Sequence, residues 1–245
     1  GQTDPQRVRE LLQGTANLEF WETYENGEVI GYLAAANDLL KEIQGDIRAE
    51  DDTLGQTVAE AIPSDTTRKE DQSLLDLIDK DTTQQVQAAT REEFALQNPL
   101  FGILIPRVNE QGEPDPSCMV GLAAGIDTAK VNEYLSMPRV KALFPRDLRF
   151  YWSQNPYKYD PSNTLYELHA IKITTRDGRA PLDGDVITSA RPTSGMTGSE
   201  VKVDFNMNAE GAKTWQRMTR ENVNRCIAVV LDGFVRSYPR VVGEI

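Results

Sequence analysis

Residues 201–238 read VKVDFNMNAEGAKTWQRMTRENVNRCIAVVLDGFVRSY, and this stretch decides the fold. Its first seven residues alternate between apolar and polar side chains, which predicts a half-buried strand. Asn208 is a good helix N-cap, and Trp215 and Met218 follow at helical spacing. The apolar run 226–231 predicts a second strand, buried on both faces. The order strand, helix, strand indicates a βαβ unit.

The residues that flank this unit extend the pattern. Asp232-Gly233 is a two-residue hairpin signal, and residues 234–238 form the expected return strand. A strand is predicted over 165–174. The glycine- and proline-containing stretch 176–198 is predicted to be a loop.

The start of the chain shows the helix and second strand of a similar unit. Asp4 and Pro5 mark the beginning of a helix, and a strand is predicted at roughly 17–24. A crossover helix needs a strand on each side, so the first helix lacks the strand before it. We therefore expect the chain to be a cut piece of a longer protein.

The middle of the chain changes character along its length. Helical spacing runs from Val29 to Ile43. Residues 42–81 then hold twelve acidic and four basic side chains, a composition that does not bury enough apolar area to order fully, and 46–70 is the candidate for disorder. Further elements are predicted beyond it: strands over 101–105, 119–124 and 148–152, and a helix capped by Asp127.

These patterns together predict an α+β fold in two parts. Residues 1–28 with 175–245 would form a ferredoxin-like, split βαβ base whose first strand is missing by truncation. Residues 29–174 would form a large inserted α+β head. Hinges are short segments that absorb dihedral change, and glycines lie at both crossings between the parts. The predicted hinge residues are Gly27, Gly31, Gly178 and Gly184.

Charge and composition exclude several classes of function. The 245 residues hold 38 acidic and 26 basic side chains, a net charge of −12. Without a basic stripe the chain is a poor partner for nucleic acid or for anionic lipid. The longest apolar run, Cys226 to Leu231, is far shorter than the roughly 18 residues that cross a bilayer. We expect no transmembrane segment.

The sequence offers few candidates for catalytic or metal-binding residues. His169 is the single histidine, and a plain strand residue is favoured for it. The carboxylates at 50–52 are interpreted as a solvated acidic run, and Thr193 to Gly195 as a flexible connector. We predict no catalytic residue, no cofactor and no metal site.

Two features are left with open alternatives. Cys118 and Cys226 could pair in an oxidising compartment, but they fall in different predicted parts, so unpaired cysteines are favoured. Four aromatic residues lie near prolines and could form a surface for extended peptides, or they could simply pack between the head and its loops. These four are Tyr151, Trp152, Tyr157 and Tyr159.

Short motifs occur in a fixed order along the chain: Asp4-Pro5, Leu18-Glu19-Phe20, residues 208–212 and Leu231-Asp232-Gly233. In this order they resemble the large extracytoplasmic domain of SecD, including the fused SecDF form. They cover roughly the first 25 and the last 65 residues, whereas 28–165 matches no assigned pattern. Asp183 and Tyr238 depart from the family pattern, which more often has Thr and a small residue there. The matching residues are Asp4, Pro5, Leu18, Glu19, Phe20, Leu182, Gly184, Asn208, Ala209, Glu210, Gly211, Ala212, Leu231, Asp232, Gly233 and Pro239.

The resemblance implies a non-catalytic role in protein export. SecD and SecF are membrane partners of the SecYEG-type channel and resemble proton-driven RND transporters. A domain of this kind would work at the periplasmic face of the bacterial inner membrane. It would contact unfolded secreted preproteins through a head that swings on its base. The family's proton-relay residues lie in membrane helices, which this sequence does not contain.

Two other function classes compete with this interpretation. A ferredoxin-like small-molecule-binding or regulatory domain of another envelope transporter would need one deep pocket with convergent polar groups. An envelope hydrolase would need a nucleophile with a positioned base, and a single histidine leaves little room for one.

Overall fold

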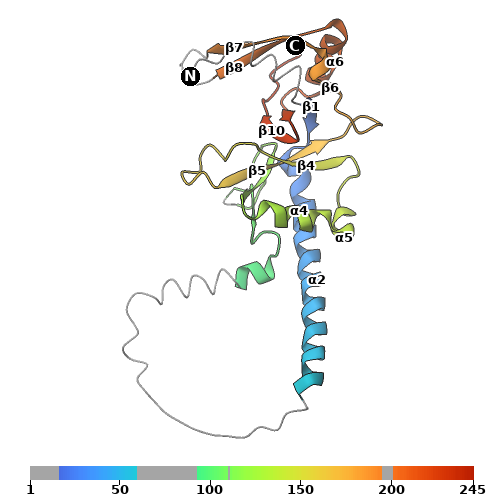
Figure 1. Cartoon of the computed structure of the whole chain (residues 1–245), viewed down its shortest axis with the longest axis vertical. Helices are drawn as coiled ribbons and strands as arrows, with labels where there is room; N and C mark the ends of the chain where they lie inside the picture. Colours follow the sequence, from blue (N-terminus) through green and yellow to red (C-terminus); the bar gives the residue numbers. More distant parts are fainter. Residues whose placement is uncertain (1–16, 60–92, 110, 195–200) are drawn as a thin grey trace.

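The computed structural model describes residues 17–59, 93–109, 111–194 and 201–245 (Figure 1). The helix predicted at Asp4 and Pro5, and the strand expected before it, lie outside these ranges. Residues 60–70 of the segment predicted to be disordered also lie outside them, as does Gly195.

One sheet runs through the centre of the described chain. Its strand order is β10-β9-β1-β5-β3-β2; β4 also pairs with β5, and β6 pairs with β1. A separate two-stranded ribbon is formed by β7 and β8. The strands are β1 Leu18–Thr23, β2 Leu104–Pro106, β3 Met119–Ala124, β4 Leu148–Trp152, β5 Leu165–Lys172, β6 Leu182–Asp183, β7 Ile187–Ser194, β8 Val201–Met207, β9 Ile227–Leu231 and β10 Phe234–Ser237.

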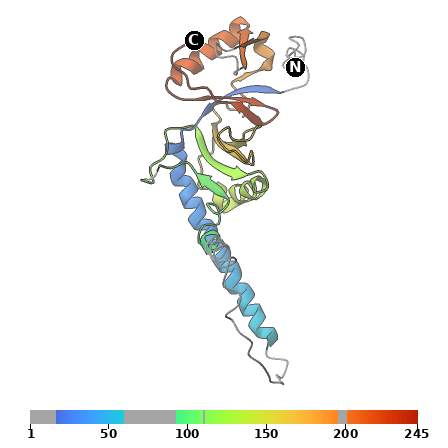
Figure 2. The same cartoon turned by 90° about the vertical axis from the view of Figure 1, so that its left-hand side faces the viewer.

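The helices lie at different levels along the molecule. In Figure 1, α2 extends downward past the remaining elements, and α6 lies at the opposite end beside β7 and β8. Figure 2 shows the same elongation from the side. No helix among the described residues combines the length and apolar character needed to cross a membrane. The helices are α2 Asn26–Ala59, α4 Thr128–Ser136, α5 Pro138–Lys141 and α6 Ala209–Glu221.

Helix α2 is longer than the sequence pattern predicts. Glu28 accepts a hydrogen bond from the backbone N–H of Glu25 at 2.7 Å, which is half of a capping box. Val29, Leu33 and Leu40 are buried on one face. The helix continues to Ala59, and the expectation of disorder over residues 46–70 stays a prediction. Once a helix is nucleated by packing, each further residue adds a hydrogen bond at little cost.

A first core cluster defines what we call the lower lobe, formed by α2, β2, β3, α4, α5, β4 and β5. Its buried residues come from Val29 to Ala170 and include Leu33, Val120 and Leu168. Val131, Tyr134 and Leu135 are buried on α4, the helix predicted after Asp127. The lower lobe therefore has a core of its own.

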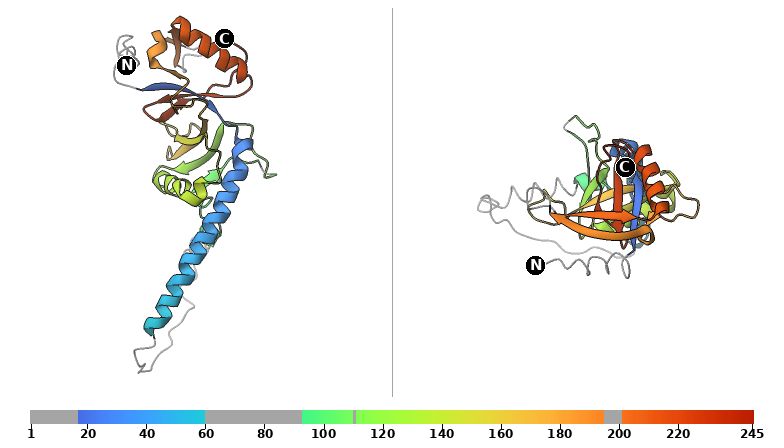
Figure 3. Two further views of the ribbon diagram at one scale, coloured as in Figure 1. Left: turned by 90° about the vertical axis from the view of Figure 1, so that its right-hand side faces the viewer. Right: turned by 90° about the horizontal axis from the view of Figure 1, so that it is seen from above.

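A second core cluster defines the upper lobe, formed by β1, β6, β7, β8, α6, β9 and β10. Leu18 and Phe20 of β1 pack with Leu182, Met218 and Ile227. The phenyl ring of Phe20 meets the ring of Trp215 edge-on, with centroids 5.5 Å apart. The view from above in Figure 3 shows the β7–β8 ribbon lying across this end of the molecule.

The two lobes are joined through one sheet. β5 of the lower lobe pairs with β1 of the upper lobe at two register positions, Glu22↔Lys172 and Thr23↔Ile171. A third core cluster crosses the same boundary and includes Trp21, Ile171 and Val235. The predicted division at residues 28 and 175 follows the first two cores, and it stays a prediction because the sheet is continuous across it.

Several predicted elements of the upper lobe are confirmed, and one is missing from the prediction. β8, α6, β9 and β10 lie where the opening motif places them. Residues 187–194, predicted to be loop, form β7 and pair along the whole of β8. Because β8 pairs with β7 while β9 pairs with β1 and β10, a split βαβ sheet is not confirmed for the described residues.

Candidate functional site: the lobe junction

The candidate site lies where α2, β3 and β9 all begin, at the boundary between the lobes. We call it the lobe junction. It brings charged and polar side chains from distant segments of the chain into a partly buried setting. Its members are Thr23, Glu25, Asn26, Glu28, Pro116, Ser117, Cys118, Glu167, His169, Arg225, Cys226, Tyr238 and Arg240.

A disulfide bond lies at the centre of the lobe junction. It joins Cys118 to Cys226 across 108 residues, with the two Cα atoms 6.2 Å apart. Both residues are buried, at 1% and 3% exposure. The preference for unpaired cysteines is therefore wrong. Each cysteine immediately precedes a strand of the shared sheet, so residues from separate cores come into contact.

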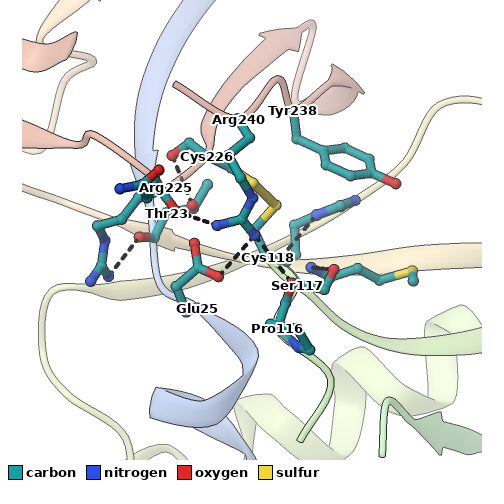
Figure 4. The surroundings of a disulfide bond; sticks show 12 residues. Thr23, Glu25, Pro116, Ser117, Cys118, Arg225, Cys226, Tyr238 and Arg240 are labelled. Carbon is teal, nitrogen blue, oxygen red and sulfur yellow. Dashed lines mark hydrogen bonds and ion pairs between the residues drawn. A yellow bond between two sulfur atoms is a disulfide. The ribbon is translucent and has the colours of Figure 1, made fainter. Parts of the chain in front are cut away.

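Arg240 connects three segments beside the disulfide (Figure 4). Its Nη2 lies 3.3 Å from Oε2 of Glu25, just before α2, and donates to the carbonyl of Pro116 at 3.2 Å. Its Nη1 donates to the carbonyl of Asn224. One guanidinium thus links the end of the chain to the segments that lead into α2 and β3.

Arg225 makes a parallel connection to α2. Its Nη2 lies 2.5 Å from Oε2 of Glu28 and 3.4 Å from the carbonyl of Thr23. Burial alone would raise the pKa of Glu28, but the hydrogen bonds from Arg225 and from the backbone of Glu25 outweigh it and lower that pKa. The hydroxyl of Thr23 donates to the carbonyl of Cys226 at 2.9 Å.

A buried polar cluster lies on the other side of the disulfide. The hydroxyl of Tyr238 donates to Oε1 of Glu167 at 2.7 Å, and the Tyr238 ring lies 4.5 Å from the His169 ring. His169 Nδ1 is 3.2 Å from the carbonyl of Cys118, and its Nε2 is 3.7 Å from Oε2 of Glu167. Burial, and then the hydrogen bond to Glu167, raise the pKa of Tyr238.

The loop before β3 packs against the first turn of α2. The backbone N–H of Asn26 donates to the carbonyl of Ser117 at 2.7 Å, and its side-chain amide donates to the carbonyl of Arg107 at 2.5 Å. Arg107 in turn lies 2.8 Å from Oδ2 of Asp115. This loop is therefore held to α2 through polar contacts.

The lobe junction also collects buried polar atoms that lack a hydrogen-bond partner. Within the described ranges these atoms are Glu25 Oε1, Asn26 Oδ1 and His169 Nε2 of the junction, and Nε of Arg107 in the loop that packs against it. Buried polar groups are normally paired, because leaving one unpaired costs about 1–3 kcal/mol. The junction thus holds three of the four such side-chain atoms among the described residues.

The groups of the junction connect the two lobes to each other. Its charged groups bind one another, and its disulfide is covalent. Among the described residues, no group of three or more histidine, cysteine or acidic side chains is placed to hold a metal ion. His169 lies at a buried position on β5, in the strand that the sequence predicts there.

The family-motif residues have structural roles in the upper lobe. Leu18, Phe20 and Leu182 form part of its core. Gly211 is required by a close approach, because a Cβ at this position would lie 2.6 Å from Cβ of Val186. Asn208 caps α6 by accepting a hydrogen bond from the N–H of Gly211 at 2.8 Å.

The remaining motif residues form turns or lie on the surface. Asp232 and Gly233 adopt positive φ angles of 51° and 83°, as a hairpin turn of this kind requires. The backbone N–H of Asn17 donates to Oδ1 of Asp232 at 2.9 Å, which fixes the turn to β1. Other motif residues lie nearby: Glu19 and Leu231 on paired strands, Ala209, Glu210 and Ala212 on the first turn of α6, and Gly184 and Pro239 in connecting segments.

The four predicted hinge glycines lie in unlike settings. Gly27 and Gly31 lie within the continuous helix α2. Gly178 has a φ of +71° in a turn between β5 and β6, and Gly184 begins a short 3₁₀ turn. They are not brought together, and whether they act as hinges stays a prediction.

The four predicted contact aromatics separate into two pairs. Trp152 is buried at 8% exposure, and its indole N–H donates to Asn132 at 2.9 Å. Tyr151 packs against the third core cluster. Tyr157 and Tyr159 stack edge-on at 5.5 Å, and Tyr159 is 75% exposed. The surface alternative is thus open to the second pair.

Turn geometry fixes this pair, of which Tyr157 is half-buried and Tyr159 is exposed, in place. Asp160 accepts hydrogen bonds from the Ser162 hydroxyl at 2.6 Å and from the backbone N–H of Leu165 at 2.9 Å. These bonds lower the pKa of Asp160. The backbone N–H of Tyr157 donates to the carbonyl of Leu165 at 2.7 Å.

Sequence reasoning missed most of the lobe junction. The ion pairs of Arg225 and Arg240 join residues about 200 apart, and no local pattern reports such contacts. The pairing of Cys118 with Cys226 did leave a usable signal. Two cysteines in a chain that resembles an extracytoplasmic domain favour a disulfide, because that compartment is oxidising.

A family model described as "SecDF, P1 head subdomain" matches residues 163–245. The chain is 34% identical over 247 residues to the protein translocase subunit SecD of Rhodothermus marinus, covering 100% of this chain and 34% of that protein. It is 29% identical over 153 residues to SecD of Syntrophobacter fumaroxidans, covering 57% of this chain and 28% of that protein.

One solved structure was also compared with this chain. "Structure and function of a membrane component SecDF that enhances protein export" aligns with 93% of this chain and 81% of that chain, at 19% identity and a TM-score of 0.26. So low a score does not establish a shared arrangement of elements. The chain spans about a third of the length of its Rhodothermus relative. The resemblance to SecD and SecDF drawn from the motifs is confirmed by the sequence matches.

Proposed function

We propose, starting from similarity to SecD over the whole chain, that this protein is an extracytoplasmic domain that assists Sec-dependent protein export. The observation that carries the proposal is the 34% identity that spans all of this chain. In this proposal the domain is not an enzyme. It makes transient contact with preproteins at the periplasmic face, next to SecF and the SecYEG-type channel, while proton flow through membrane helices supplies energy.

The disulfide supports the proposal that this domain lies in an oxidising compartment. Disulfides persist in the periplasm and outside cells, and they are rare in the reducing cytosol. Cys118 and Cys226 are bonded in the described structure. An oxidising location is therefore part of the proposal, and it agrees with a domain that meets chains as they leave the channel.

The two lobes support a mechanical role. Each has its own core, and only two register positions of the sheet join β1 to β5. The family description of a head subdomain falls on residues 163–245, whereas the sequence pattern assigns most of these residues to the base. We propose relative motion of the lobes without assigning either name to one of them.

Client contact is proposed at the exposed Tyr159 and its half-buried neighbour Tyr157. Tyr157 and Tyr159 present aromatic surface from a turn held by Asp160. Aromatic side chains offer apolar contact without a sequence requirement, which suits a surface that must bind and release many chains.

Site-specific photo-crosslinking in the intact membrane protein tests this function. A photoreactive phenylalanine at Tyr159 should crosslink to a preprotein stalled in the channel. The same probe at Val242 is the matched control, because Val242 is also apolar and is 93% exposed, but it lies in the upper lobe far along the chain. Equal crosslinking at both positions, or none at Tyr159, would contradict client contact at this pair.

A further inference from the structure

Exposed cations gather where the start of β4 meets the loop between β5 and β6. Residues 139–149 and 172–179 together hold seven basic side chains and two acidic ones, in a chain with 38 acidic and 26 basic side chains. The net charge of −12 argues against anionic lipid as a partner for the chain as a whole. Charges more than about 10 Å apart are largely screened in about 0.1 M salt, however, so a local excess of one sign acts independently of that total.

The pairing of β4 with β5 brings these two segments together. The backbone N–H of Ile173 donates to the carbonyl of Asp147 at 2.7 Å, which extends the pairing to the turn before β4. The guanidinium of Arg149 reaches the loop after β5, where its Nη1 lies 3.5 Å from the carbonyl of Gly178. Cations that are distant in sequence therefore lie on adjacent surface.

Four arginines form what we call the basic surface. They are Arg146, Arg149, Arg176 and Arg179, and each is exposed. Within the described residues only Arg179 has a carboxylate partner among them, Oδ2 of Asp177 at 3.9 Å, and both side chains of that pair are largely exposed. An exposed pair of this kind contributes little to stability. The guanidinium groups are therefore available to an external anion.

The two carboxylates beside the basic surface already have hydrogen-bond donors. Asp147 accepts the hydroxyl of Tyr24, and burial, followed by this bond, raises the pKa of Tyr24. Oδ1 of Asp177 accepts the backbone N–H of Arg179 at 3.2 Å. Neither carboxylate neutralises Arg146, Arg149 or Arg176, so the surface keeps an excess of positive charge.

The surface around these arginines favours phosphate over polypeptide. No large apolar side chain is exposed in residues 127–158 or 160–191, all of which the structure describes. Recognition of an extended peptide commonly uses apolar grooves or pockets, which this surface does not offer. A guanidinium binds phosphate through two parallel hydrogen bonds. Two more exposed cations lie upstream on α5: Arg139 and Lys141.

We propose that the basic surface binds the phosphate headgroups of anionic phospholipids. This inference rests on the proposed function, because that function places the domain beside a membrane. Each cation held near an anionic membrane surface raises the affinity about fivefold. Without an exposed apolar side chain to insert between lipids, the binding is reversible and depends on salt.

Co-flotation of the 245-residue chain with lipid vesicles tests the proposal. Vesicles of about 30% phosphatidylglycerol in phosphatidylcholine should bind the chain at least about tenfold more tightly than vesicles of phosphatidylcholine alone. Raising the salt from about 0.1 M to about 1 M shortens the screening length from about 10 Å to about 3 Å and should abolish this difference. Equal binding to the two kinds of vesicle would overturn the proposal.

Two separate double variants locate the site. R146Q/R149Q and R176Q/R179Q should each weaken binding to the anionic vesicles by at least about tenfold. All four side chains are exposed, so both variants should keep the thermal unfolding midpoint of the wild type. Unchanged vesicle binding in both variants would exclude the basic surface.

A matched control separates this surface from total charge. R217Q/R220Q removes two exposed arginines from α6 in the upper lobe, so it changes the net charge by the same amount. Its binding to anionic vesicles should stay within about twofold of the wild type. A loss equal to that of R146Q/R149Q would show that only the total charge matters and would contradict the proposal.

Other anions distinguish lipid from competing partners. If a polyglutamate peptide bound the wild type more tightly than the anionic vesicles did, the partner would be an acidic polypeptide and the proposal would be wrong. Inorganic phosphate should displace the vesicles no better than chloride at the same ionic strength; stronger displacement would indicate a discrete phosphate site instead. None of these measurements involves a preprotein, so failure of lipid binding is distinguishable from failure of the crosslink at Tyr159.

Discussion

The lower and upper lobes are assembled from the chain in different ways. The core of the lower lobe draws on residues between Val29 and Ala170. The core of the upper lobe joins Leu18 and Phe20 to residues from Leu182 to Val241. The lower lobe can therefore close on neighbouring segments, whereas the upper lobe exists only when two distant parts of the chain meet.

This difference has an energetic consequence. Pairing of Phe20 with Val229 closes a loop that contains the whole lower lobe. The entropy of closing a loop rises with its length, but only slowly, and a folded lower lobe shortens the effective loop. The upper lobe should depend on the lower lobe, and the reverse dependence should be weaker.

Loss of the disulfide should be the largest single effect. A bond across 108 residues restricts the unfolded chain, which is worth about 4.8 kcal/mol in the loop-entropy description. C118S/C226S should lower the free energy of unfolding by about that amount in urea titrations. Because the upper lobe forms from two distant parts of the chain, it should unfold first. The fluorescence of Trp215 should therefore change before that of the lower lobe. A loss below about 1 kcal/mol would show that the bond does little for stability.

Cavity-forming substitutions sharpen the comparison between the lobes. Leu33 and Met218 are each 0% exposed, one in each core. Leu33→Ala and Met218→Ala should each cost about 3 kcal/mol. Leu33→Ala should weaken both lobes, whereas Met218→Ala should leave lower-lobe amides protected in hydrogen exchange. Identical exchange patterns would mean that the lobes unfold as one unit.

The next largest effect on stability should come from replacing Gly211 of the upper lobe. Gly211→Ala places a methyl group 2.6 Å from Cβ of Val186, and overpacking of this kind costs about 1–3 kcal/mol. Thermal unfolding would measure the change. The control is the pair G211A/V186A, in which the smaller side chain makes room. If the added alanine stabilises the protein on its own, the close approach at α6 is wrong.

The smallest predicted effect is electrostatic and lies at the start of α2. The pKa of Glu28 is lowered in the folded state, so its contribution is present above the unfolded pKa and is lost as pH falls through the folded one. The pair with Arg225 is partly exposed, which limits the effect to under about 1 kcal/mol. Between about pH 7 and about pH 3.5, Glu28→Gln should lose slightly less stability than the wild type. Urea titrations at both pH values, with Glu113→Gln as an exposed control, would show it; equal losses in both proteins would contradict it.

Much of the upper lobe could be predicted because its signals are local. Asn208 caps α6, and Asp232-Gly233 turns the last hairpin, as the sequence indicates. Alternation of apolar and polar residues over a few positions is enough to identify β8. Such features depend on backbone chemistry within a few residues, and tertiary contacts do not reverse them here.

The lobe junction and β7 could not be predicted for the opposite reason. β7 contains Pro192 and polar residues, and it forms a strand because β8 supplies the hydrogen bonds. The contacts of Arg240 with Glu25, and of Cys118 with Cys226, depend on how the lobes meet. A pattern within one segment carries no information about a partner a hundred or more residues away.

The length of α2 amplifies small rotations at its start into large displacements of its far end. Thr23 ends β1 and Asn26 begins a helix of 34 residues, so two residues connect the sheet to a rod of about 51 Å. A tilt of about 10° at the start of such a rod moves its far end by about 9 Å. A small rotation of the helix start near Cys118 and Cys226 would thus produce a much larger displacement of Ala59.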